Sequence, residues 1–334
     1  MFSGTTSRDT VFREGRGNVY RFQRPSEEHG VPSHVPVLLV PSMLHRWYVL
    51  DLCEGASVAS AISNGTPWET FCFDWGVPED EDRYLTWDDV VARLDRVVRF
   101  VQKRTGAPRV ALVGYSLGAT LSAIYAALRP ERVASIVNIA GPFDFAAPCT
   151  LSHLVDPRWF DAEAMTSAGN LPAHIMQAGF FALAPTHALA RLVRLVDEAD
   201  DPQALRSFTA LESWAADTIP FPAAAYVTYV KELYQENRLL KGEHRVRGER
   251  VDLAKIACPV LSIVAEKDGV CPAESTLALN EAVSSDVADV IRMEGGHVSA
   301  IVGPRAHEEL YPLVVDWLRR HATTAGARAP ESRL

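Results

Sequence analysis

Residues 109–119 read RVALVGYSLGA, and this stretch decides the fold. Residues 109–113 are mostly apolar, which is typical of a strand buried on both faces of a sheet. The next five letters, GYSLG, match the pattern G-x-S-x-G, and an Ala-rich helix is predicted over residues 117–128, ahead of Pro130. A serine in a tight turn between a buried strand and a helix is typical of a nucleophile elbow.

Segments on both sides of this elbow alternate between short apolar runs and helical patterns. Thr86 and Asp89 have the spacing of a capping box, apolar residues then recur every three or four positions, and Gly106 ends the predicted helix. This alternation indicates an α/β fold with a mostly parallel central sheet and helices on both faces. Further strands are predicted at residues 18–23, 36–40, 69–73, 133–139, 259–265 and 286–293, and a closing helix at 304–321.

The alternation stops between residues 142 and 250. This segment is irregular, helical in character and rich in Trp, Phe and Tyr, so we expect a helical cap inserted into one α/β core rather than a second tandem domain. The core then comprises residues 18–141 and 251–321. Residues 1–17 are predicted to be a flexible leader, and residues 322–334 a disordered tail.

The composition narrows the classes of protein. The chain has 334 residues, with 33 Lys and Arg against 42 Asp and Glu, and its formal net charge of −9 argues against a nucleic-acid-binding surface. It has no run of about 18 apolar residues and no secretory h-region, so neither a membrane span nor export is expected. Five cysteines stand singly, which argues against a metal site or a disulfide framework and favours the reducing cytoplasm.

A serine nucleophile needs a base, and the base needs a carboxylate that orients it. In an α/β-hydrolase these groups follow in the order Ser, Asp or Glu, His, on loops beyond the carboxyl ends of strands. Asp268 follows the strand predicted at 259–265, and His297 follows the strand that ends near Met293. The expected catalytic triad is therefore Ser116, Asp268 and His297.

Neighbouring residues leave alternatives open. Glu266 is the rival of Asp268, which we prefer because it lies further along its loop. His307 and His321 fall in the closing helix, where we expect them to face solvent. Tyr115, directly before the serine, is a candidate for substrate binding.

Stabilising the oxyanion requires two backbone donors. We expect one from Leu117, the residue after the nucleophile, and the other from Met43, or else its neighbour Leu44, in the loop after the first buried strand. His45 and Arg46 in the same loop either bind an anionic or carbonyl part of the substrate or only cap the segment that follows.

Several longer motifs accompany the elbow. They read LVPSMLHRWYVLD (39–51), FDWGVPEDEDRY (73–84), VNIAGPFDF (137–145), YQENRLLKG (234–242), AEKDGVCP (265–272) and GGHV (295–298). In these motifs the chain resembles the polyhydroxyalkanoate synthases, especially the short class that works with a separate partner subunit. The resemblance places Ser116 on the nucleophile, Asp268 on the acid and His297 on the base, and it places residues 142–250 on the family's cap.

Three positions differ from the pattern that this resemblance implies. The synthases have Cys where this chain has Ser116, often a His where it has Gly269, and commonly an Asn where it has His45. A Cys nucleophile exchanges acyl groups with CoA at nearly equal energy, thioester for thioester. An acyl-serine is an oxoester of lower energy, so return to a thiol is disfavoured, and attack by water, a hydroxyl or an amine is favoured.

The expected function is therefore that of a serine acyltransferase or thioesterase. It would act through acyl-Ser116 on an acyl-CoA or carrier-protein thioester, with no cofactor, and a homodimer or a partner subunit is the expected assembly. One alternative is a carboxylesterase or polyester depolymerase. Another is a non-catalytic partner subunit of a synthase, against which the complete triad argues.

Overall fold

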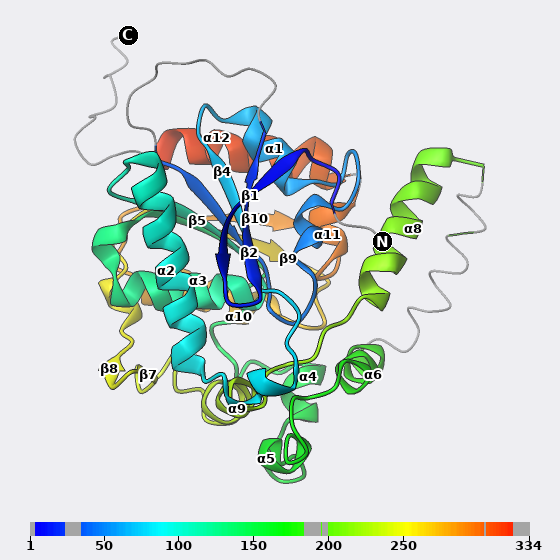
Figure 1. Ribbon diagram of the computed structural model, residues 1–334, viewed down its shortest axis with the longest axis vertical. Helices are drawn as coiled ribbons and strands as arrows, with labels where there is room; N and C mark the ends of the chain where they lie inside the picture. Colours follow the sequence, from blue (N-terminus) through cyan, green and yellow to red (C-terminus); the bar gives the residue numbers. More distant parts are fainter. Residues whose placement is uncertain (1–3, 24–34, 184–194, 196–199, 304, 323–334) are drawn as a thin grey trace.

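Eight strands form one sheet in the computed structural model, which describes residues 4–23, 35–183, 195, 200–303 and 305–322 (Figure 1). Their order across the sheet is β1-β2-β4-β3-β5-β6-β9-β10. All pairs from β4 to β10 are parallel, whereas β2 is antiparallel to both β1 and β4. The predicted α/β-hydrolase class is confirmed. The strands are β1 (Arg8–Glu14), β2 (Gly17–Phe22), β3 (Val37–Val40), β4 (Thr70–Asp74), β5 (Val110–Tyr115), β6 (Val133–Ile139), β9 (Val260–Ala265) and β10 (Ala288–Met293).

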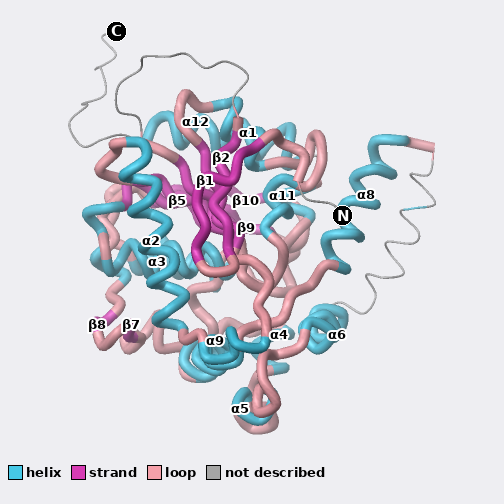
Figure 2. Tube along the Cα trace, in the orientation of Figure 1, coloured by secondary structure: helices cyan, strands magenta, loops and turns pink. Residues whose placement is uncertain are grey.

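Helices cover both faces of this sheet, which is why every residue of β3, β4, β5, β6 and β9 is buried. One apolar cluster packs α2, α3 and α10 on one face, and a second packs α1, α11 and α12 on the other. Figure 2 shows the helices around the strands of the sheet. No helix in the described ranges is both long enough and apolar enough to cross a bilayer. These helices are α1 (Val58–Gly65), α2 (Trp87–Thr105), α3 (Leu117–Leu128), α10 (Ala273–Ala282), α11 (Ser299–Val302) and α12 (Tyr311–His321).

The ends of α2 follow from local chemistry. Thr86 Oγ1 accepts a hydrogen bond from the Asp89 amide, and the Asp89 carboxylate accepts one from the Thr86 amide, so two free N–H groups of the first turn are satisfied. Gly106 ends the helix in the left-handed conformation, with φ 72°. The predicted bounds of this helix are confirmed.

Residues 142–250, which we call the cap, are mainly helical. In Figure 1 helices α4, α5, α6 and α9 lie below the sheet, and α8 lies to its right. The chain between α6 and α8 lies largely outside the described residues. The elements are α4 (Thr150–Leu154), α5 (Ala162–Met165), α6 (Ala173–Leu183), α8 (Pro202–Ala216), α9 (Ala223–Thr228), the π-helix η4 (Tyr229–Gln235), β7 (Arg245–Val246) and β8 (Glu249–Arg250).

The N-terminal segment differs from the sequence prediction. The flexible leader expected over residues 1–17 is wrong for residues 8–14, which form β1 and pair with β2. The reason is that β2 offers an open edge to which this charged segment can bond. The closing helix is divided into a π-helical turn, η6 (Ala306–Leu310), and α12. The tail after residue 322 lies outside the described residues.

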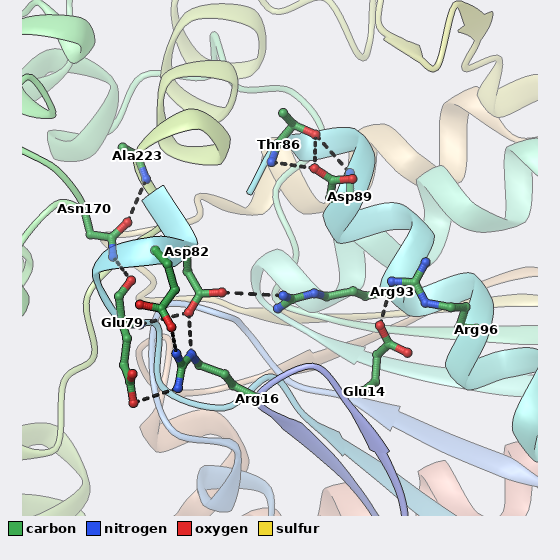
Figure 3. Close-up of polar contacts among 11 residues, drawn as sticks. Glu14, Arg16, Glu79, Asp82, Thr86, Asp89, Arg93, Arg96, Asn170 and Ala223 are labelled. Carbon is green, nitrogen blue, oxygen red and sulfur yellow. Dashed lines mark hydrogen bonds and ion pairs between the residues drawn. The ribbon is translucent and has the colours of Figure 1, made fainter. Parts of the chain in front are cut away.

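A polar network ties the β1–β2 hairpin to the core and to the cap (Figure 3). Arg16, in the hairpin turn, donates from Nε to Asp82 Oδ2 at 2.8 Å and lies 2.7 Å from Glu79 Oε1. Asn170 of the cap donates from Nδ2 to the Glu79 carbonyl at 2.6 Å and accepts from the Ala223 amide at 3.3 Å. These contacts fasten one side of the cap to the core.

Candidate active site

The carboxyl ends of the parallel strands meet at one edge of the sheet, and the candidate residues follow those ends. Ser42 comes after β3, Ser116 after β5, Asp268 after β9 and His297 after β10. Ser42, Ser116 and His297 line one cavity. The topology thus brings together side chains that are far apart in the sequence, as it does in other open α/β sheets.

Ser116 occupies a strained turn between β5 and α3. Its φ of 54° and ψ of −128° lie in a region that residues with a side chain rarely adopt. A Cβ atom at Gly114 would overlap the backbone of Ala119, and one at Gly118 would overlap the carbonyl oxygen of Val40. The two glycines are therefore required by close backbone approach, and the turn they permit exposes the serine hydroxyl to the cavity.

Asp268 is placed to orient His297. The distance from His297 Nδ1 to Asp268 Oδ2 is 2.7 Å. The other oxygen, Oδ1, accepts hydrogen bonds from the amides of Val270 at 2.8 Å and Cys271 at 2.9 Å, and the carboxylate is fully buried. Both carboxylate oxygens are thus engaged, which holds the imidazole in one orientation, with Nε2 on the part of the ring that does not bond Asp268.

The alternatives to these residues point away from the site. Glu266 is exposed and donates only its backbone amide, to the Met293 carbonyl, among the contacts of the described residues. His307 is exposed on η6, and His321 packs against Trp317 at the end of α12. None of these three side chains lines the described cavity.

The expected oxyanion donors lie on the two loops next to Ser116. Leu117 is the first residue of α3, so its amide has no acceptor in a preceding helical turn. The Leu44 amide donates to Ser42 Oγ at 3.2 Å, which engages it and favours Met43 as the second donor. The side chains of Leu117 and Met43 are both buried in the core cluster beneath the cavity.

The sequence predicts the same two alternative roles for His45 and Arg46, but the structure gives them different surroundings. His45 lines the cavity, and its ring packs against both Phe180 and Trp214, with ring centroids 4.7 Å from each. Arg46 turns toward the cap, where its Nε lies 3.8 Å from Asp217 Oδ2. Arg46 thus has a structural contact, and only His45 is placed to meet a substrate.

Tyr115 contacts His297 through a hydrogen bond and through its ring. Its hydroxyl donates to the His297 carbonyl at 3.4 Å, and the two rings lie 5.3 Å apart. Burial and the charge of Asp268 raise the pKa of the Tyr115 phenol well above its ordinary value, so it stays protonated. Tyr115 also lines the cavity, as expected for a substrate-binding candidate.

The cavity has a volume of about 680 Å³ and lies between the core loops and the cap. One titratable thiol is on its wall: Cys271, whose Sγ lies 3.2 Å from Thr276 Oγ1. Burial raises the pKa of this thiol, which keeps it a poor nucleophile beside Ser116. In the described ranges no three His, Cys, Asp or Glu residues gather as a metal site would require. Most of the other lining side chains are apolar and come from the cap, among them Leu151, Leu154, Val155, Phe160, Met165, Leu171, Ile175, Met176, Phe180, Trp214, Tyr226 and Val230.

Sequence reasoning missed the cap residues that flank His45. Phe180 lies on α6 and Trp214 on α8, which are far from His45 in the sequence. The two rings meet His45 only in the folded chain. The available signal was the abundance of aromatic residues in the cap, which does not distinguish a cavity wall from an ordinary core.

The chain is similar to known proteins in both sequence and structure. The family model of the alpha/beta hydrolase fold matches residues 35–304. The chain is 31% identical to the poly(3-hydroxyalkanoate) polymerase subunit PhaC of Haloferax mediterranei, over 98% of this chain and 67% of that protein. It is 32% identical to the subunit of the same name from Allochromatium vinosum, over 95% of this chain and 89% of that protein.

Solved structures of other enzymes share the fold. A thermophilic esterase from Thermogutta terrifontis superposes with a TM-score of 0.55 at 16% identity, covering 96% of this chain and all of that one. The thioesterase domain from the curacin biosynthetic pathway superposes with a TM-score of 0.51 at 15% identity, covering 93% of this chain and 99% of that one. At these identities the likeness extends to the fold alone.

Proposed function

The chain belongs to the α/β-hydrolase fold family and, within it, to the poly(3-hydroxyalkanoate) polymerase subunits PhaC, and we propose that it transfers a 3-hydroxyacyl group from a thioester through an ester on Ser116. The observation that carries this proposal is the strained elbow that presents Ser116 to the cavity lined by His297. CoA or a carrier protein supplies the thioester.

In the first half-reaction Ser116 Oγ attacks the thioester carbonyl carbon. His297 accepts the serine proton, and Asp268 orients the imidazole through Nδ1. The amides of Leu117 and Met43 stabilise the oxyanion, each by about 3–4 kcal/mol. The C–S bond then breaks, and His297 gives the proton to the leaving thiol.

In the second half-reaction an oxygen nucleophile takes the acyl group. A hydroxyl acceptor exchanges one ester for another at little cost, whereas return to a thiol would raise the energy. The new C–O bond forms as the bond to Ser116 breaks, and His297 passes the acceptor's proton to the serine oxygen. The apolar wall of the cap favours an acyl acceptor over water, because it keeps the number of water molecules near the ester low.

The test measures thiol release and the mass of the Ser116 peptide. We expect 3-hydroxyacyl-CoA to release thiol and to leave the acyl group on that peptide. Ser116→Ala should lose both signals by at least ~10⁴-fold. Ser167→Ala is the matched control, because Ser167 is exposed on the cap.

Two outcomes would contradict the proposal. Cleavage of oxoesters with no thiol release from any acyl-CoA would indicate a carboxylesterase or depolymerase. A Ser116→Ala protein that keeps its full function in the cell would indicate a non-catalytic partner subunit.

A further inference from the structure

His45 places a second imidazole on the wall of the cavity. Its Nδ1 atom is enclosed by protein and has no hydrogen-bond partner, while the residue itself lines the cavity. Because Nδ1 is enclosed, the ring can meet a ligand only through its opposite side, which carries Nε2. The ring therefore depends on Nε2 for a hydrogen bond, because a buried polar ring that forms none is costly.

The surroundings of His45 keep it neutral. Burial and, to a smaller extent, the nearby His297 lower the pKa of this imidazole to about 4. A neutral imidazole is a weak partner for an anion, which favours a charged donor. It is a good partner for a hydroxyl, because a hydroxyl can donate or accept and so matches Nε2 in either tautomer.

Contacts with residues of the cap hold the His45 ring in position. Its backbone pairs with Thr218 of the cap, and the indole of Trp214 donates to the Arg46 carbonyl at 2.9 Å. The Phe180 ring also packs against the imidazole, with ring centroids 4.7 Å apart. The imidazole therefore stands at the seam between the oxyanion loop and the cap, two residues from the donor at Met43.

We propose that His45 binds the 3-hydroxyl group of the acyl chain and selects 3-hydroxyacyl substrates over acyl groups that lack it. This inference rests on the proposed function, because it places the acyl carbonyl at Ser116 and the amide of Met43. The 3-hydroxyl lies two carbons from that carbonyl, and His45 lines the same cavity as Ser116 and His297. A site that pairs with a substrate hydroxyl rejects the analogue without it, because the buried partner is then left unpaired.

The test compares binding of two uncleavable ligands by calorimetry. These are a 3-hydroxyacyl amide of pantetheine and the matching acyl amide without the hydroxyl. We expect the wild-type protein to prefer the hydroxylated amide, and His45→Phe, which keeps an aromatic ring against Phe180 and Trp214, to lower that preference at least ~10-fold. His45→Gln keeps a hydrogen-bonding group and should restore part of the preference.

The control is His307→Phe, which changes an exposed histidine outside the cavity and should leave the preference unchanged. A preference that is absent in the wild type, or equal in the wild type and His45→Phe, would overturn the inference. Because the ligands are not cleaved, this result is independent of turnover. Failure of the proposed function would appear separately, as an absence of acyl-Ser116 with 3-hydroxyacyl-CoA.

Discussion

The core and the cap build opposite sides of one cavity by different means. On the core side, β5 and α3 are buried along their whole length, and backbone contacts at Gly114 and Gly118 set the position of Ser116. On the cap side, apolar side chains remain open to solvent, with Trp159 60% and Phe181 53% exposed. The core side is thus buried throughout, whereas the cap side also carries exposed apolar side chains.

The different burial of the two sides suits them to different tasks, catalysis on the core side and substrate selection on the cap side. Bond making and breaking require atoms held within fractions of an ångström, which a buried core provides. Choosing an acyl chain and an acceptor requires only a wall of suitable shape and polarity, which the largely apolar cap side of the cavity provides. Substitutions in the core should therefore have large effects on rate or folding, and those toward the cap should have smaller and more selective effects.

After Ser116→Ala, the largest effect is expected from Asp268→Asn in the core. An amide can hold His297 in the wrong tautomer and cannot stabilise its protonated form, so kcat should fall by about 10³–10⁴-fold while the protein stays folded. Thiol release from acyl-CoA measures the rate, and circular dichroism checks the fold.

The matched variant for Asp268 is Glu266→Gln. It changes an exposed carboxylate two residues away on the same loop. We expect its kcat to stay within about 2-fold of the wild type, since exposed groups outside the site rarely alter catalysis. An equal loss in the two variants would mean that loop charge, not the Asp268–His297 hydrogen bond, matters.

Gly118→Ala should be the most destabilising small change in the core. The added methyl group would overlap the carbonyl oxygens of Val40 and Pro41, so the end of β3 and the oxyanion loop must move. We expect a loss of at least ~3 kcal/mol in the free energy of unfolding. Urea unfolding measures it, and a loss below 1 kcal/mol would show that the elbow is less tightly packed than its contacts indicate.

The different burial of core and cap also explains which helices and strands could be predicted from the sequence. Helix 117–128 and strand 133–139 were predicted with the bounds that the structure shows, because buried elements have unbroken apolar runs and clear stops. Strand β1 was missed because its residues, RDTVFRE, are charged and half exposed at the sheet edge. The cap helices have no clear period, since most of their apolar residues face a cavity or solvent.

In the candidate site, too, the residues of the core could be predicted and their contacts with the cap could not. Chain order and strand ends were enough to predict Ser116, Asp268 and His297, because the topology of the sheet brings those loops together. The separate surroundings of His45 and Arg46 could not be predicted. They depend on Trp214 and Asp217 at the end of α8, a tertiary contact across more than 160 residues that leaves no local pattern.

His45→Phe should change acid stability at the seam between core and cap. The pKa of His45 is about 4 in the folded protein and about 6.5 in the unfolded chain, so only the unfolded chain gains a proton between these values. The free energy of unfolding of the wild type should therefore fall by up to ~3 kcal/mol relative to the variant as pH falls from 6.5 to 4. Urea unfolding of both proteins at pH 7, 5 and 4 measures this difference, and parallel curves would contradict it.

The smallest effect is expected within the cap itself, from Gly179→Ala in α6. A methyl group there would meet no described atom within 4 Å, in contrast to the overlap at Gly118. Glycine inside a helix costs about 0.5–1 kcal/mol relative to alanine, so the free energy of unfolding should rise by that amount. Urea unfolding of Gly179→Ala beside Gly118→Ala thus compares the same added atom in both regions. A loss at both positions would mean that the cap is packed as tightly as the core, and the separation of their tasks would no longer follow from packing.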